Sequence, residues 1–167
     1  MIEPYYYHQL RAAFTPDPVR LVLLFESPPV SGRYFYDPED GATEVLCLAV
    51  MKLFGWTPAT KREGLELLQS AGVVLLDATY QQVDKMTRVQ RREIMRGEYA
   101  DLVARLPDAP ILIGMAGVLD AVGRALINDG FDVLNRGRRI PFPAMGHQPK
   151  FHELAREAIR QTGLVTL

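Results

Sequence analysis

The sequence predicts one α/β domain in which a short, mostly parallel sheet of four strands lies between two layers of helices. Four short apolar runs in the 167-residue chain alternate with segments of helical periodicity. The runs are apolar at nearly every position, which is typical of parallel strands covered on both faces. We therefore expect a three-layer α/β/α sandwich over residues 1–167, with residues 1–17 as an N-terminal extension.

The expected strands all end in polar or glycine-containing segments. The first strand ends in Glu26-Ser27-Pro28-Pro29, the second reaches Asp77, and the third ends at Gly114. The fourth is short and precedes a basic turn. The expected strands cover residues 19–25, 73–76, 110–113 and 131–134.

Capping signals mark two of the expected helices. Thr60-Lys61-Arg62-Glu63 and Thr87-Arg88-Val89-Gln90 both have the spacing of a capping box. Gly72 ends the first of these helices, and Pro149 fits the first turn of the last helix. The expected helices cover residues 43–53, 60–70, 87–106, 117–128 and from Pro149 to near Gly163.

Composition excludes several classes of protein. With 48% hydrophobic and 23% charged residues and a net charge of −1, the chain is an ordinary globular protein. The single cysteine, Cys47, excludes an intramolecular disulfide and an all-cysteine cluster, and its apolar neighbours predict a buried thiol. The sequence shows no signal peptide, membrane span or glycine-rich nucleotide motif. We expect a cytoplasmic monomer without cofactor or metal.

Four segments that are far apart in the chain follow the expected strands. They are Glu26, Asp77, the turn at Gly114 and the proline-containing loop from Phe142 to His147. Parallel strands bring their carboxyl ends to one edge of the sheet, where α/β proteins bind ligands. The prolines after Glu26 restrict the backbone, so we expect Glu26 to be held at this edge.

These segments resemble, in their order, the motifs of the uracil-DNA glycosylase superfamily, whose fold is a three-layer α/β/α sandwich. Phe25-Glu26-Ser27-Pro28-Pro29 is similar to its first motif, Gly-Glu-Ala-Pro-Gly in the iron–sulfur branch. Gly32-Arg33-Tyr34-Phe35-Tyr36 is similar to the segment whose phenylalanine stacks on the extruded base. Leu75-Leu76-Asp77-Ala78-Thr79 resembles the segment whose asparagine reads the base. Phe142-Pro143-Ala144 resembles the second motif, His-Pro-Ser or His-Pro-Ala.

The resemblance implies a divergent DNA glycosylase that removes a flipped, damaged or mismatched base. Cleavage of an N-glycosidic bond develops positive charge on the sugar, which the Glu26 carboxylate can stabilise while it orients water. His147 is the candidate donor to the departing base. The resemblance further implies base-binding residues Phe35, Asp77, Ser27 and Phe142 and, from the basic loop, DNA-backbone contacts by Arg136, Arg138, Arg139 and Lys150.

The chain departs from the family pattern at two positions. Asp77 stands in place of the asparagine, and an ionised aspartate only accepts hydrogen bonds. This favours a base with an exocyclic amine, or a protonated Asp77. Phe142 stands in place of the motif histidine, so His147 must reach into the site if a histidine is to stabilise the departing base. One cysteine cannot hold the iron–sulfur cluster of that branch.

Structural roles for the same residues remain open. Glu26 can cap a helix or pair with Arg33, Phe35 can belong to the core, and His147 can bond a backbone carbonyl. Two basic segments, 85–96 and 136–150, can be solvated faces. The alternatives to a DNA glycosylase are a non-catalytic relative that binds nucleic acid or a nucleobase-like ligand, and a hydrolase of free nucleosides or nucleotides.

Overall fold

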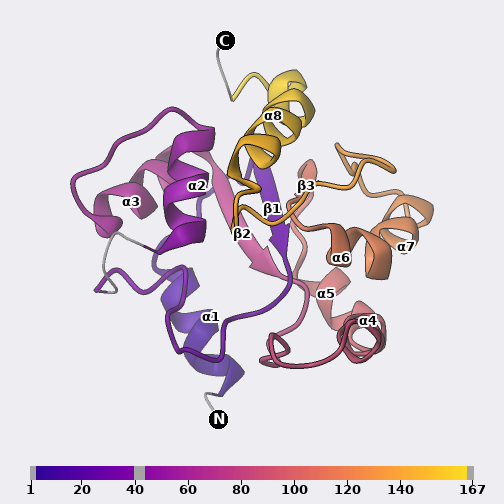
Figure 1. Ribbon diagram of the computed structural model, residues 1–167. Coiled ribbons are helices and arrows are strands. Elements are labelled where there is room, and N and C mark those ends of the chain that lie inside the picture. The colour runs from indigo at the N-terminus through magenta and orange to yellow at the C-terminus, as the bar shows by residue number, and fades with distance from the viewer. Residues whose placement is uncertain (1–2, 40–43, 165–167) are drawn as a thin grey trace.

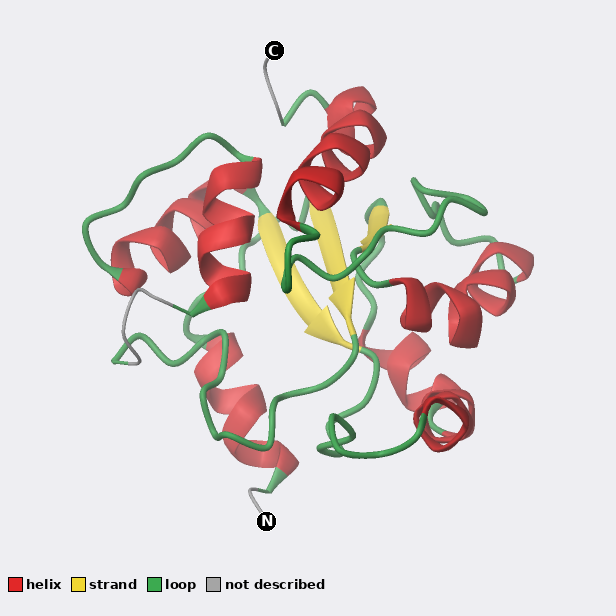
Figure 2. Ribbon diagram, in the orientation of Figure 1, coloured by secondary structure: helices red, strands yellow, loops and turns green. Residues whose placement is uncertain are grey.

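The computed structural model describes residues 3–39 and 44–164, and it has a parallel sheet at its centre with helices around it (Figures 1 and 2). The strands are β1 (Leu21–Phe25), β2 (Val73–Asp77) and β3 (Ile111–Ile113), in the order β2-β1-β3. Every residue of the three strands is buried, as their apolar sequences require. The predicted α/β class is confirmed.

Helices connect and cover the strands. α3 packs beside β2, and α8 packs beside β3 and α2. The helices are α1 (Pro4–Ala12), α2 (Val45–Leu53), α3 (Lys61–Ala71), α4 (Arg88–Gly97), α5 (Tyr99–Arg105), α6 (Ala116–Val118), the π-helix η1 (Leu119–Gly123), α7 (Arg124–Asn128), α8 (Gln148–Ile159) and the 3₁₀ helix η2 (Arg160–Thr162). None of the helices in the described ranges combines the length and the hydropathy that a bilayer-spanning segment needs.

Both predicted helix starts are confirmed. The Thr60 hydroxyl accepts a hydrogen bond from the Glu63 backbone N–H at the start of α3. Thr87 and Gln90 form a reciprocal capping box at the start of α4. Gly72 ends α3 with φ = 80°, a left-handed conformation that favours glycine. Cys47 is buried in α2, as predicted, and burial raises the pKa of its thiol to about 11.

Three helical segments differ from the expectation. The helix predicted over residues 117–128 consists of α6, the π-helix η1 and α7 in succession. The single helix predicted over residues 87–106 is broken at Glu98, which separates α4 from α5. Gly97 is a poor helix former, and the Glu98 carboxylate accepts hydrogen bonds from Thr79 and Gln81, which lie after β2. The segment expected to be an N-terminal extension contains α1, which packs on the core through the buried Tyr7.

The segment predicted to be a fourth strand makes a single parallel bridge between Ile111 and Val133. Beyond the bridge, the side chain of Asn135 takes the place of a neighbouring strand. Its Oδ1 accepts from the Ile113 N–H and its Nδ2 donates to the Ile113 carbonyl, both at 3.0 Å. Nδ2 also donates to the Arg138 carbonyl. Asn135 therefore ends the sheet and fixes the start of the basic turn.

Replacement of Asn135 by alanine is expected to lower the free energy of unfolding by about 3 kcal/mol, because the buried N–H and carbonyl of Ile113 lose their partners. Urea unfolding followed by circular dichroism measures the change. Asn128→Ala, at an exposed position of α7, is the matched control and should change stability by less than about 0.5 kcal/mol. Equal effects of both substitutions would contradict this role of Asn135.

Candidate functional site

Glu26 is a buried carboxylate at the carboxyl end of β1. Its backbone carbonyl accepts from the Thr79 N–H, which joins the ends of β1 and β2, and the residue is 8% exposed. Its Oε2 lies 3.1 Å from Nη1 of Arg91 on α4. Burial raises the pKa of Glu26 above its ordinary value, although the guanidinium of Arg91 acts in the opposite direction.

The first turns of α4 hold Arg91 in this position. The Arg91 Nε donates to the Met86 carbonyl at 2.9 Å, and Nη2 donates to the Asp84 carbonyl. The Thr87 capping box fixes the start of the same helix. The ion pair predicted as an alternative for Glu26 therefore exists, but with Arg91 and not with Arg33.

Glu26 lines a cavity of about 590 Å³ between α4, the segment after β3 and the loop that precedes α8. Four arginines line it against two carboxylates, so its charge favours an anionic ligand. The Phe142 ring supplies an apolar surface. The side chains that line the cavity and carry charge or a ring are Glu26, Asp120, Arg88, Arg91, Arg92, Arg139 and Phe142.

Phe142 reaches this cavity because of packing at the end of β3. Its ring meets the Phe25 ring edge-on, with the centroids 6.1 Å apart. Phe25 in turn lies directly over Gly114, where an added Cβ would be 2.4 Å from the Phe25 ring. Gly114 is therefore required for this packing. The structure brings Glu26, the Gly114 turn and Phe142 together, as expected for the ends of parallel strands.

Asp77 lies in a different environment from Glu26. It is 3% exposed and does not line the Glu26 cavity. Its Oδ2 and the Tyr34 hydroxyl are both buried with no hydrogen-bond partner in the described part of the chain. Burial raises the pKa of Asp77 to about 7, against the opposing charges of Arg11 and Arg105. The base-binding role predicted for Asp77 therefore places it at a different position from the cavity that Glu26 lines.

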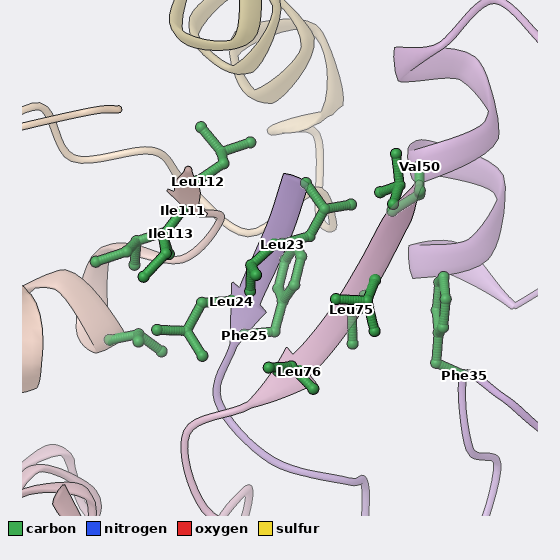
Figure 3. Packing of buried hydrophobic residues seen from close by; sticks show 14 of the residues in the cluster. Leu23, Leu24, Phe25, Phe35, Val50, Leu75, Leu76, Ile111, Leu112 and Ile113 are labelled. Carbon is green, nitrogen blue, oxygen red and sulfur yellow. The ribbon is translucent and has the colours of Figure 1, made fainter. Parts of the chain in front are cut away.

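Phe35 belongs to the hydrophobic core, and this corrects its prediction as a stacking surface. The side chain is 3% exposed and lies beside α2 among buried residues (Figure 3). The neighbouring Tyr36 is anchored in the core as well, because its hydroxyl accepts from the Leu75 N–H at 2.7 Å. Ser27 is half-buried and does not line the Glu26 cavity. Neither Phe35 nor Ser27 contributes to the cavity that Glu26 lines.

His147 lies outside the Glu26 cavity. It is exposed and immediately precedes α8, where its backbone carbonyl accepts from the Phe151 N–H. The prediction that His147 donates to a departing base is therefore not supported by its position. Phe142, three residues after the basic turn ends at Arg139, is the part of this loop that reaches the cavity of Glu26.

The predicted DNA-backbone residues are divided between separate surfaces. Arg139 lines the Glu26 cavity and pairs with Asp120, whereas Arg136 and Arg138 line another cavity. Arg138 pairs with Glu157, and Lys150 pairs with Glu153. Three of the four predicted contacts are thus engaged in exposed ion pairs, which contribute little to stability and are screened by salt.

The arginines of α4 are the functional candidates that sequence reasoning missed. The basic cluster in residues 85–96 is evident in the sequence, where a solvated face is an open alternative for it, and no site residue is predicted in it. The position of the cluster is the signal that could have found it: Arg88, Arg91 and Arg92 follow the N-cap residue Thr87, in the first turns of the helix after β2. Such a helix starts near the sheet edge at which Glu26 lies.

No protein-family model, curated protein or solved structure gives a significant match to this chain. Within residues 3–39 and 44–164, no group of three or more histidine, cysteine, aspartate or glutamate side chains could hold a metal ion. The cavity that Glu26 lines is therefore the feature of the molecule that indicates a function.

Proposed function

We propose that the chain is a divergent DNA glycosylase of the uracil-DNA glycosylase superfamily that hydrolyses the N-glycosidic bond of a flipped, damaged or mismatched base. One observation carries the proposal: the buried Glu26 carboxylate, at the end of β1, lines a cavity with four arginines. The three-layer α/β/α arrangement with a four-stranded sheet is part of the same proposal.

The chemistry follows from the charges in the cavity. Positive charge develops on the sugar as the bond from C1′ to the base nitrogen breaks, and the ionised Glu26 stabilises it. A water held by the Glu26 carboxylate forms the new bond to C1′ and gives up one proton to that carboxylate, while the electron pair of the broken bond leaves with the base, which takes a proton from solvent. The cavity guanidinium groups supply the positive charge that favours this departure. Phe142 replaces Phe35 as the stacking surface for the base.

Met145 is proposed to fill the space left by the extruded base. It lies at the tip of the Phe142 loop, is 95% exposed, and has φ = 53°, an uncommon conformation for a residue with a side chain. Proteins that distort DNA insert apolar side chains of this kind between base steps. Removal of this side chain therefore should impair base extrusion more than the chemical step.

Met145→Ala is expected to lower excision from double-stranded DNA about tenfold, since flipping costs a few kcal/mol that the inserted side chain partly offsets. Excision from single-stranded DNA should change little. Single-turnover rates on both substrates measure the effect. Leu48→Ala, an exposed apolar position on α2, is the control. An equal loss of excision rate on the single-stranded and the double-stranded substrate would contradict insertion by Met145.

A base-excision panel tests the proposed activity. The protein is incubated with end-labelled single- and double-stranded oligonucleotides that each carry one uracil, hypoxanthine, xanthine, alkylated or oxidised base, and alkali then cuts any abasic product. Cleavage at one modified base, and not at normal bases, supports a glycosylase and identifies its substrate. Binding of these oligonucleotides by the folded protein without any cleavage would favour the alternative below.

The alternative is a non-catalytic protein that binds nucleic acid or a nucleobase-like ligand through the same cavity. The ion pair between Glu26 and Arg91 favours it, because a buried carboxylate that is held by a guanidinium has a structural role even without chemistry. In that case Glu26 positions Arg91 to bind the ligand, and no bond of the ligand is cleaved.

A further inference from the structure

Arg88 and Arg92 lie one helical turn apart on α4, and both line the Glu26 cavity. Neither guanidinium forms a hydrogen bond or an ion pair with any residue in the described ranges. Like charges four residues apart destabilise a helix. The two side chains therefore present unneutralised positive charge to the cavity in the absence of a ligand.

The neighbouring arginines are already engaged. Arg91 binds Glu26 and two backbone carbonyls, and Arg139 pairs with Asp120. Arg96, one turn after Arg92, donates to the carbonyls of Asp120 and Ala121. Arg88 and Arg92 are thus the cavity arginines whose donors remain available to a ligand.

We propose that Arg88 and Arg92 form a phosphate clamp, so that the ligand of this cavity carries a phosphate next to the sugar that faces Glu26. Each guanidinium has a planar fork of donors that matches phosphate oxygens. Arg88 is the first residue of α4, where the helix dipole also favours an anion. This inference rests on the proposed function and deepens it: the substrate is a nucleotide unit, and a free nucleoside or base lacks the group that the clamp binds.

Binding measurements test the clamp without any chemical step. The probes are inorganic phosphate, a deoxynucleoside, its 5′-monophosphate, and a single-stranded oligonucleotide with a stable abasic-site analogue. The variants are Arg88→Ala, Arg92→Ala, the double alanine variant and the double lysine variant. Arg160→Ala, in η2 at the opposite end of the molecule from α4, removes the same charge outside the cavity (Figure 1). Circular dichroism checks that each variant folds.

Each alanine substitution should weaken oligonucleotide binding about tenfold, as is usual for loss of a charged hydrogen bond. Each should also reduce the slope of log K against log salt by about 0.7. The double lysine variant should retain the salt slope but bind more weakly, because lysine lacks the planar fork. Arg160→Ala should change affinity less than about twofold. Unchanged affinity and salt slope in the double alanine variant would overturn the clamp.

The probes also separate the possible sources of the phosphate. Binding of the monophosphate, but not of the nucleoside, supports a clamp for free nucleotides, and binding of the oligonucleotide alone supports a clamp for a strand. Binding of nucleoside and monophosphate with equal affinity would overturn the clamp. Excision that survives in the double alanine variant would leave the proposed function in place without the clamp. Binding of phosphate without excision of any base would support the clamp and contradict the proposed glycosylase activity.

Discussion

Asp77→Asn is expected to stabilise the protein by up to about 4 kcal/mol above pH 7 and to leave its stability near pH 4 almost unchanged. The Asp77 carboxyl is buried in the structure, and its pKa is raised to about 7 from an ordinary value of 3.8. The unfolded chain therefore loses this proton near pH 4, whereas the folded protein holds it to about pH 7.

The sign of the effect follows from this difference. Between the two pKa values, the folded state binds more protons at this site than the unfolded state, so stability falls as pH rises, by about 1.4 kcal/mol per pH unit. Above pH 7, the folded state carries the full cost of a buried carboxylate that Arg11 and Arg105 only partly offset and that Glu44 increases. Asparagine is neutral at every pH and avoids this cost.

Urea unfolding between pH 4 and pH 8 measures the prediction. The wild-type protein should lose stability over this window relative to Asp77→Asn, and the difference should level off above pH 7. Asp132→Asn, an exposed position before the Val133 bridge, is the matched control and should follow the wild type. A difference between Asp77→Asn and the wild type that does not vary with pH would contradict a buried, protonated Asp77.

The elements that local sequence determines were predicted correctly. Apolar runs located β1, β2 and β3, because strands buried on both faces need an apolar side chain at every position. The Thr60 and Thr87 caps were predicted because a cap depends on residues three positions apart. The Asn135 pairing with Ile113 was not predicted, since a side chain that replaces a strand leaves no periodic signal.

The site was harder to predict, because it depends on which way side chains point. The sequence placed Glu26 and Phe142 at one edge of the sheet, and the structure puts both in one cavity. It could not show that Phe35 is buried or that Asp77 faces Tyr34 and Arg11, because burial of the 34–36 block depends on the packing of α1 and α2. It also could not choose between two basic segments of similar composition.

Glu26→Gln is expected to lower excision by about 10²- to 10⁴-fold while DNA binding changes only a few-fold, because the amide keeps the shape of the carboxylate but cannot stabilise a positive sugar or accept a proton. Glu157→Gln is the matched control. It breaks another ion pair between glutamate and arginine, with Arg138, outside the cavity and should leave excision unchanged. Single-turnover rates and anisotropy titrations measure the two quantities.

The pH profile separates a catalytic Glu26 from one that only positions Arg91. If the ionised carboxylate acts, excision falls at low pH through a pKa above the ordinary value for glutamate, because burial raises it. Arg91→Met removes the guanidinium that lowers this pKa, so the acidic limb should move to higher pH. An acidic limb that keeps its position in Arg91→Met, together with excision that survives in Glu26→Gln, would contradict catalysis by Glu26.

The same variants also test the non-catalytic alternative: if Glu26 serves only to hold Arg91, both substitutions weaken DNA binding equally and no variant shows turnover.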